Sequence, residues 1–272
     1  MIHINHLKKS YDSFTLECSL DIPKGVITGI IGMNGAGKST LFKSILGINP
    51  IDEGNIQIPD KQDIGVVLSE TGFSEFFTVS DIISILKCTY KRFDEDLFHS
   101  YCQRFDIPLD KKTRTFSTGM KAKLNIIIAL THHAQLLILD EPTAGLDVLT
   151  RDEILDILRD YMEQEDCTIL ISSHISSDLE SLCDDFYIID HGQIIMHEEM
   201  DTLLSQYGVL KVSKEDYDNL DKDYLLKAMK EPFGYSCLTN ERQFYSENYP
   251  TIVIEQNHID TMIPILLKGE RL

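Results

Sequence analysis

One stretch of the chain has residue types and spacing that fit phosphate chemistry: IIGMNGAGKST, over residues 30–40. It places Gly32, Gly37, Lys38 and Ser39 at the G-x-x-x-x-G-K-[ST] spacing of a P-loop. Glycines suit such a loop because backbone N–H groups that turn inward around phosphate oxygens leave no room for Cβ atoms. The lysine can reach the β- and γ-phosphates, and Ser39 can offer its hydroxyl to Mg²⁺. A glycine-rich turn without a ligand is the alternative, and the complete spacing together with the lysine favours the phosphate site.

A second stretch, QLLILDEPTAGLD over residues 135–147, could supply acidic groups. Its apolar residues 136–139 predict a buried strand, and Asp140 and Glu141 follow at the C-terminal end, where open α/β sheets bind ligands. Asp140 can hold Mg²⁺ or its water, while Glu141 can orient or deprotonate an attacking water. The alternative is a strand that merely ends in charged residues, but a P-loop upstream favours the catalytic interpretation.

Two further side chains could contact a nucleotide. Tyr11 lies in a polar stretch, KKSYDSF, where its ring could stack on an adenine or could equally be an ordinary edge-strand tyrosine. His174 ends the run CTILISSH, residues 167–174, and could donate to the γ-phosphate if that strand lies beside the P-loop strand. A lone histidine is more often structural than catalytic, so its role depends on that placement.

The stretches around these motifs predict an α/β sheet with crossover helices. Residues 26–31 (VITGII) form a short β-branched run that leads into the P-loop, and residues 41–47 follow it with apolar positions at helical spacing. The other predicted strands cover residues 1–30 in two or three runs, 52–58, 64–70, 136–139, 167–174 and the two arms of a hairpin about residues 191–192. The other predicted helices of this domain cover residues 150–164 and 198–208.

Residues 75–104 change to a helical periodicity and predict a helical insertion in the sheet domain. Thr78 or Ser80 could cap its first helix, and residues 121–133 resume a helix after the break IPLDKKTRTFSTGM. We therefore place one nucleotide-binding domain at residues 1–208, with a helical subdomain at about residues 75–130.

Beyond residue 208 the pattern predicts a small α+β appendage, residues 209–272. Its run VLKVS predicts a strand and residues 214–231 predict a helix. Three short strands are predicted next, in GYSCLTN (234–240), RQFYSE (242–247) and TIVIEQ (251–256), before a final helix at residues 258–269.

The bulk composition narrows the function classes. The net charge of -19, from 44 acidic and 25 basic residues, argues against a protein that binds the phosphate backbone of nucleic acid. Six cysteines without a C-x-x-C pair favour reduced thiols in a cytosolic protein over a zinc ribbon or a redox motif. The N-terminus has no apolar core typical of a signal peptide, and no run approaches the roughly 20 apolar residues of a membrane helix.

The stretch FSTGM, residues 116–120, adds a family resemblance because it lies between the P-loop and LLILDEP. It resembles the signature motif of ABC-type ATPases, and residues 1–208 are similar to an ABC nucleotide-binding domain. Five elements stand in the family's order: Tyr11, GMNGAGKST, FSTGM, LLILDEPTAGLD and His174. The continuation GMKAKL and the C-terminal extension resemble the ATPase subunits of ABC-2-type exporters of the bacitracin-resistance and YtrB-like group.

The resemblance implies a role for each matching residue. Tyr11 would stack on adenine, Glu141 would be the general base and His174 the γ-phosphate sensor. Ser39 and Asp140 would hold Mg²⁺. The residues that wrap the phosphates would be Gly32, Met33, Asn34, Gly35, Ala36, Gly37, Lys38, Ser39 and Thr40. The residues that reach the nucleotide of a second subunit or lie across the dimer interface would be Ser117, Thr118, Gly119 and Asp147.

The sequence departs from the family pattern at two places. Thr118 stands where the signature usually has its first glycine, and a side chain there narrows the approach to the backbone. The family glutamine that should follow the strand at residues 64–68 is absent, and Ser69 and Glu70 stand there instead. Either residue could replace it as a Mg²⁺ ligand, Ser69 through a water.

The resemblance implies an ATP-hydrolysing subunit that dimerises on ATP and drives export through a separate polytopic membrane subunit. The cargo would be peptides or amphipathic antimicrobial compounds, and the second ATPase subunit could be a copy of this chain or a related one. We expect ATP and Mg²⁺ as cofactors, no nucleic acid, and a cytoplasmic location at the inner face of the cell membrane. The alternatives are a soluble ABC ATPase that acts on nucleic acid or the ribosome, and a regulatory module built on residues 209–272.

Overall fold

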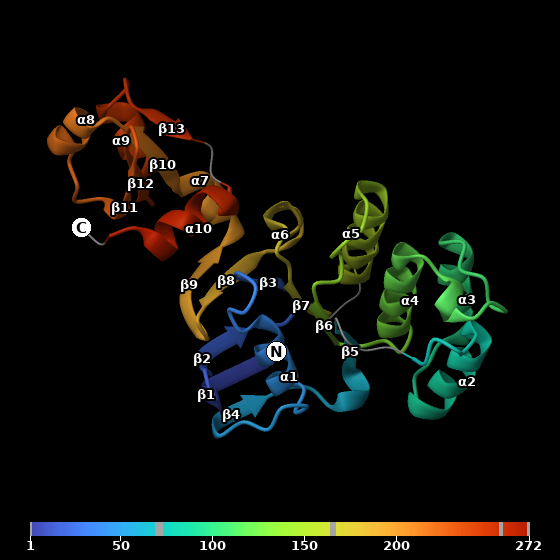
Figure 1. Ribbon diagram of the computed structural model, residues 1–272. Coiled ribbons are helices and arrows are strands. Elements are labelled where there is room, and N and C mark those ends of the chain that lie inside the picture. The colour runs from blue at the N-terminus through green and yellow to red at the C-terminus, as the bar shows by residue number, and fades with distance from the viewer. Residues whose placement is uncertain (1, 69–72, 164–166, 256–257, 271–272) are drawn as a thin grey trace. The chain divides into compact units, whose positions relative to one another are not determined.

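The computed structural model describes residues 2–68, 73–163, 167–255 and 258–270 (Figure 1). By its internal contacts the chain divides into two compact units. The first comprises Met1–His174 and Tyr187–Met196, and the second Ile175–Phe186 and His197–Leu272. The division predicted at residue 208 stays a prediction.

The main sheet of the molecule has six strands in the order β5-β6-β7-β3-β8-β9. They are β3 Ile27–Ile31, β5 Ile64–Val67, β6 Leu136–Asp140, β7 Thr168–Ser172, β8 Asp185–Asp190 and β9 Gln193–Glu199. The first four in spatial order pair in parallel, and every residue of β3, β6 and β7 is buried. This parallel arrangement confirms the predicted α/β class. It also explains the sequence pattern, because strands that are buried on both faces of a sheet have continuous apolar runs in the sequence.

The register of the three central strands brings the predicted motifs to one edge of this sheet. Strand β7 lies between β6 and β3, and Ser172 stands opposite Asp140 on one side and Ile30 on the other. The P-loop, Glu141 and His174 follow the C-terminal ends of these strands, and Asp140 is the last residue of β6. The strand that precedes His174 therefore lies beside the P-loop strand, and the role of His174 stays a prediction.

A second, antiparallel sheet shares an apolar core with the P-loop helix α1 (Lys38–Ile45). Its strands, in the order β2-β1-β4, are β1 Ile2–Tyr11, β2 Phe14–Ile22 and β4 Glu53–Gln57. Buried residues of this sheet, of α1 and of β6 belong to one apolar cluster, which includes Leu16, Phe42 and Ile138. Because this core fixes α1 against both sheets, it also fixes the end of the P-loop.

Helices occupy most of the range of the predicted helical insertion and form the green group in Figure 1. Its helices are α2 Val79–Thr89, α3 Glu95–Arg104 and α4 Thr118–Leu130, and the helix α5 Val148–Met162 follows β6. Of the two candidate caps, Thr78 begins α2: its hydroxyl accepts a hydrogen bond from the Asp81 N–H at 3.1 Å, and the Asp81 carboxylate accepts from the Thr78 N–H at 2.8 Å. This reciprocal pair satisfies two N–H groups at the helix start.

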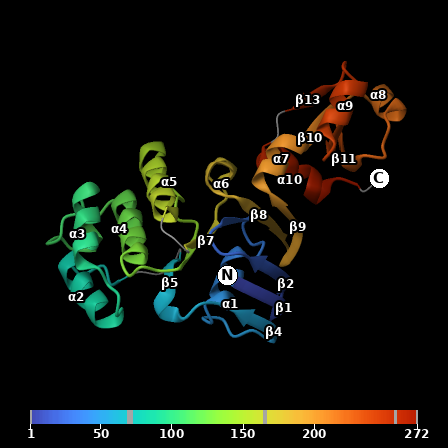
Figure 2. The ribbon, with the colours of Figure 1, turned by 180° about the vertical axis from the view of Figure 1, so that it is seen from behind.

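The second unit is built on an antiparallel sheet of order β11-β12-β10-β13. Its elements are α6 Ser176–Leu182, α7 Met200–Gln206, β10 Gly208–Val212, α8 Lys214–Asn219, β11 Leu225–Glu231, β12 Gly234–Thr239, α9 Arg242–Asn248, β13 Val253–Glu255 and α10 Ile259–Lys268. Figure 2 shows α8 and α9 on one side of this sheet and α10 on the other. Within the described residues, no helix combines the length and the apolar character needed to cross a bilayer.

Two predictions for this unit are wrong. Residues 214–231 do not form one helix, because α8 ends at Asn219 and the chain continues as β11, which pairs with β12 and buries Leu225 and Ala228. The run RQFYSE is not a strand but lies in α9, where the buried Tyr245 packs in an aromatic cluster with Tyr249 four residues on. In both cases tertiary packing overrides local propensity. The short helix α6 was not predicted.

Gly65 in β5 allows the helix α4 to approach the main sheet closely. A Cβ built on Gly65 would lie 2.3 Å from the Ala129 carbonyl oxygen and 2.5 Å from Leu137 Cδ2. Since Ala129 belongs to α4, this glycine sets how the helix that begins after Ser117 lies against β5 and β6.

We expect Gly65→Ala to lower the free energy of unfolding by about 1–3 kcal/mol, because the added methyl group meets backbone on one side and a packed side chain on the other. Urea denaturation followed by circular dichroism measures this change. A variant with the stability of the parent chain would show that α4 and β5 can separate at no cost.

Candidate nucleotide site

The P-loop of this chain joins β3 to α1 through two residues where glycine is structurally required. Gly37, directly before α1, has φ +116°, in the region that side chains disfavour. At Gly32 a Cβ would lie 2.4 Å from the Ile189 carbonyl oxygen. The first turn of α1 contains no acidic residue, so its N–H groups and the helix dipole are open to an anion.

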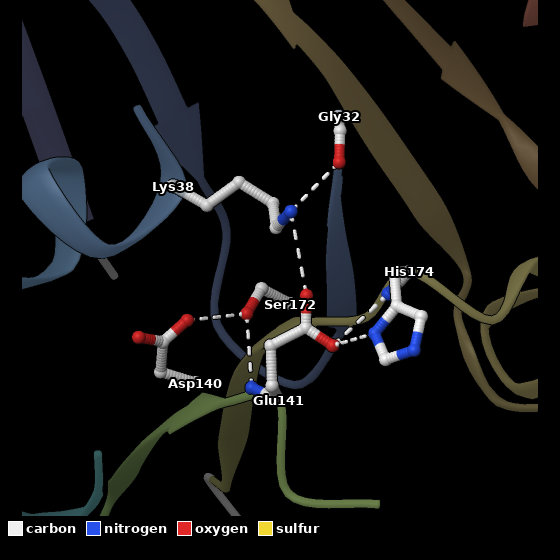
Figure 3. A network of polar contacts seen from close by, with 6 residues as sticks. All are labelled: Gly32, Lys38, Asp140, Glu141, Ser172 and His174. Atoms are coloured by element: carbon white, nitrogen blue, oxygen red, sulfur yellow. Dashed lines mark hydrogen bonds and ion pairs between the residues drawn. The ribbon is translucent and has the colours of Figure 1, made fainter. Parts of the chain in front are cut away.

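Lys38 is the cation of this loop, and its side chain is only 6% exposed. Its Nζ donates to the Gly32 carbonyl oxygen at 2.7 Å and lies 3.3 Å from Glu141 Oε1 (Figure 3). A buried ammonium requires such partners because an isolated charge away from water is strongly unfavourable. The P-loop and the end of β6 are thus joined by an ion pair.

Glu141 occupies the centre of the polar network drawn in Figure 3. Its second carboxylate oxygen, Oε2, accepts from the His174 N–H at 3.1 Å and lies 2.5 Å from His174 Nδ1. Its backbone has φ +54°, a left-handed conformation that costs a non-glycine residue free energy and occurs mainly at functional sites. Lys38, Glu141 and His174, which are far apart in the sequence, therefore lie in one polar network.

Asp140 is buried at the end of β6, with 1% of its surface exposed. Its Oδ1 accepts from the Ser172 hydroxyl at 2.7 Å, while Oδ2 has no hydrogen-bond partner among the described residues. A buried carboxylate oxygen without a donor is costly, and it suits a cation with oxygen ligands such as Mg²⁺. Ser39 lines the same cavity as Lys38, and Glu141, the residue after Asp140, lines it too. A serine hydroxyl and a buried carboxylate oxygen are ligands of the type that Mg²⁺ takes, so the chemistry of these residues fits a magnesium site.

A cavity of about 420 Å³ lies over the P-loop. Its lining residues are Phe14, Met33, Asn34, Gly35, Gly37, Lys38, Ser39, Thr40, Glu141, Ala144 and His174. Of the residues predicted to wrap the phosphates, all but Gly32 and Ala36 line it. The cavity is thus formed mainly by the P-loop, and its remaining wall comes from Phe14 of β2 and from residues that follow β6 and β7.

The aromatic residue that lines this cavity is Phe14, which the sequence analysis did not identify. Its ring packs on the loop, since a Cβ at Gly37 would lie 2.9 Å from Phe14 Cζ. Tyr11 is 46% exposed, its hydroxyl accepts from Asn49 Nδ2 at 3.1 Å, and its ring centroid lies 6.4 Å from that of Phe14. The signal for Phe14 was available, because both aromatics stand in the same stretch, KKSYDSF.

The residues predicted to reach a second subunit lie together on the surface of the first unit. Ser117 is exposed and caps α4, accepting from the Met120 N–H at 3.2 Å, and Thr118 is also exposed. Asp147 is exposed and caps α5. Its carboxylate accepts a hydrogen bond from the Thr150 N–H, and this bond lowers the pKa of the Asp147 carboxyl group. A Cβ at Gly119 would lie 3.1 Å from Thr150 Cγ2, so the two helix starts are neighbours.

Ser69 and Glu70, the two candidates for the missing glutamine, lie outside the described residues. The choice between them therefore stays a prediction.

The sequence and the fold of this chain are both similar to those of ABC transporter ATP-binding proteins. The sequence profile of the ABC transporter family matches residues 16–144, and that of an AAA domain matches residues 112–177. The Bacillus subtilis ABC transporter ATP-binding protein YtrB is 30% identical over 231 residues, covering 81% of this chain and 79% of YtrB. The lantibiotic transport ATP-binding protein SrtF of Streptococcus pyogenes is 35% identical over 212 residues, covering 74% of this chain and 92% of SrtF. A solved ATP-binding subunit of an ABC transporter superposes with a TM-score of 0.68 at 25% identity, covering 76% of this chain and 92% of that structure.

The two aromatics near the P-loop can be separated by mutation. We expect Phe14→Ala to weaken ATP binding about tenfold, because stacking of a base on an aromatic ring contributes roughly 1–3 kcal/mol. Phe14→Tyr, which keeps the ring, should bind ATP like the parent chain, and isothermal titration calorimetry measures both affinities. Loss of affinity in Tyr11→Ala with none in Phe14→Ala would instead support the predicted stacking on Tyr11.

Proposed function

Because this chain belongs to the family of ABC transporter ATP-binding proteins and is an ATPase of that family, we propose that it powers export through a separate membrane subunit. The observation that carries the proposal is the network in Figure 3, which joins the P-loop lysine, the acidic pair after β6 and His174. These groups are the ones that γ-phosphate hydrolysis needs.

In the proposed reaction Glu141 is the general base and His174 contacts the γ-phosphate. The phosphates of ATP enter the loop and become the partners of Lys38, which releases the Glu141 carboxylate to orient and deprotonate a water for in-line attack. Ser39 and Asp140 would hold Mg²⁺, and the ion, when bound, would supply positive charge that stabilises the phosphates. The left-handed backbone of Glu141 directs the carboxylate at the loop before nucleotide binds.

We infer that the site is completed by a second ATPase subunit. Ser117, Thr118 and Gly119 form the start of a helix of 13 residues without acidic side chains in its first turn, which suits contact with the γ-phosphate of a partner's nucleotide. Beside Asp147, Val148 and Leu149 are 61% and 77% exposed. Adjacent exposed apolar side chains at a proposed interface would be covered by the second subunit.

A separate apolar groove suits the membrane subunit. It has a volume of about 530 Å³ and lies in the first unit between β5 and the helices α2 and α4. Its lining residues are Leu46, Ile48, Ile58, Lys61, Ile64, Val66, Val67, Leu68, Phe73, Ile85, Leu86, Thr89, Tyr90, Asn125 and Ile128. We propose that a cytoplasmic helix of the membrane subunit packs here, beside the segment that leads to Ser69 and Glu70, and brings this chain to the inner face of the membrane.

The proposed cargo is a peptide or amphipathic antimicrobial compound. The support is the 35% identity to SrtF, a lantibiotic transport ATP-binding protein. The α+β segment at residues 209–272 has an apolar cluster of its own, which includes Leu210, Cys237 and Tyr245, and we propose a regulatory or dimerising role for it.

The base assignment predicts the behaviour of Glu141→Gln. This variant should lose at least about 100-fold in ATP turnover, since a positioned general base contributes roughly 10²–10⁴-fold. ATP affinity should be kept or raised, because Lys38 no longer has to leave a carboxylate when phosphate enters. Phosphate release and calorimetric ATP binding measure the two effects, and turnover at the parent rate would refute the assignment of Glu141.

The groove assignment predicts a separation of partner binding from nucleotide binding. Ile85→Glu should reduce co-purification with the membrane subunit at least about tenfold, because it buries an unpaired charge in an apolar contact. ATP affinity should not change. The matched control is Ile195→Glu, at a 43% exposed position of β9 outside the groove, which should still co-purify. Equal recovery of both variants would exclude the groove as the docking site.

A further inference from the structure

We propose that Ser172 is a positioning residue for the hydrolysis reaction, acting through both members of the acidic pair. The proposal rests on the roles proposed for Asp140 and Glu141. Ser172 is the last residue of β7 and is fully buried, so its hydroxyl has no access to water. In the sequence it is one of two serines before His174, and nothing in the motif pattern distinguishes it.

The Ser172 hydroxyl makes two hydrogen bonds, and together they determine which neighbour receives its single proton. Its Oγ accepts from the Glu141 N–H at 3.0 Å and lies 2.7 Å from Asp140 Oδ1 (Figure 3). Because the Glu141 amide can only donate, the hydroxyl proton must be given to Asp140. One buried hydroxyl thus connects the side chain of one acidic residue to the backbone of the next.

The hydrogen bond from Ser172 determines which oxygen of Asp140 can coordinate a cation. The Ser172 proton is directed to Oδ1, which leaves Oδ2 as the carboxylate oxygen without a partner among the described residues. Groups that hydrogen-bond to a metal-ligating carboxylate fix its orientation, and their loss lowers metal affinity or activity roughly 10–100-fold. Ser172 therefore determines how the Asp140 carboxylate is turned.

A second consequence concerns the backbone of Glu141. Its left-handed conformation, with φ +54°, persists only if surrounding contacts enforce it. The Glu141 N–H is held by Ser172 twice, through Oγ at 3.0 Å and through the backbone oxygen at 3.2 Å. This anchor sets the direction in which the Glu141 carboxylate reaches Lys38 and His174.

The same geometry makes the test selective. Ser172→Ala removes the hydroxyl but keeps the backbone oxygen that accepts from Glu141, so the strand pairing is retained. Ser172→Cys keeps a side chain of similar size whose thiol is a weak hydrogen-bond donor and acceptor. Ser44→Ala is a matched control, because the Ser44 hydroxyl in α1 is also buried and has no partner among the described residues.

We expect Ser172→Ala and Ser172→Cys to lower kcat about 10–100-fold with little change in KM for ATP. A second readout is Mn²⁺ affinity in the presence of a non-hydrolysable ATP analogue, followed by electron paramagnetic resonance, and it should weaken about tenfold. Ser44→Ala should match the parent chain in both measurements. Thermal unfolding of each variant reports whether the fold is kept.

The proposal would be overturned if Ser172→Cys had a kcat and a Mn²⁺ affinity within about threefold of the parent values. A threefold change in rate corresponds to a change in the activation barrier that is too small for the loss of a positioning contact. A lowered melting temperature with unchanged kcat for the folded protein would overturn it as well, since Ser172 would then only pack. Glu141→Gln measured in parallel separates this result from the proposed function. If Glu141→Gln remains active, the base assignment fails whatever the Ser172 variants do.

Discussion

A buried ammonium group that needs negative charge is the constraint on which the site depends. Lys38 Nζ is held by one carbonyl oxygen and by Glu141, 3.3 Å away. An unpaired charge at that depth would cost several kcal/mol, so the loop can exchange this carboxylate only for another anion. The phosphates of ATP are that anion in our account, and their arrival both satisfies Lys38 and releases the group that activates water.

The exchange works because the sheet fixes both partners before nucleotide enters. Strand β7 lies between β6 and β3, which places the residues after these strands within hydrogen-bonding distance of one another. Glu141 is held in a left-handed conformation, and Ser172 connects its amide to Asp140. The close packing of the three fully buried strands β3, β6 and β7 offsets the free-energy cost of the left-handed backbone at Glu141.

Local motifs were predictable from the sequence, and contacts that depend on tertiary packing were not. The P-loop and the pair Asp140 and Glu141 are fixed by spacing within a few residues, and the buried strands before them read as apolar runs. Ser172 carries no such pattern, since its contacts depend on the pairing of β7 with β6, a segment more than 30 residues away. Phe14 stands beside Tyr11 in the sequence and pairs with it in the β1–β2 hairpin, but the sequence does not show that its ring packs on Gly37. The errors in residues 214–231 and 242–247 have the same origin, because helical and strand propensities there were outweighed by a sheet that closes over its own aromatic core.

We propose that this P-loop forms half of an ATP site and that Ser117 of a second subunit supplies the rest. The most direct measurement mixes equal amounts of a Lys38→Ala chain and a Ser117→Arg chain, each inactive alone, and follows ATP hydrolysis. Exchange of subunits across a two-fold dimer gives mixed dimers with one intact composite site, so the mixture should regain up to about a quarter of the parent activity. Full activity of the Ser117→Arg chain by itself, or a mixture that stays inactive although mixed dimers form, would contradict the account.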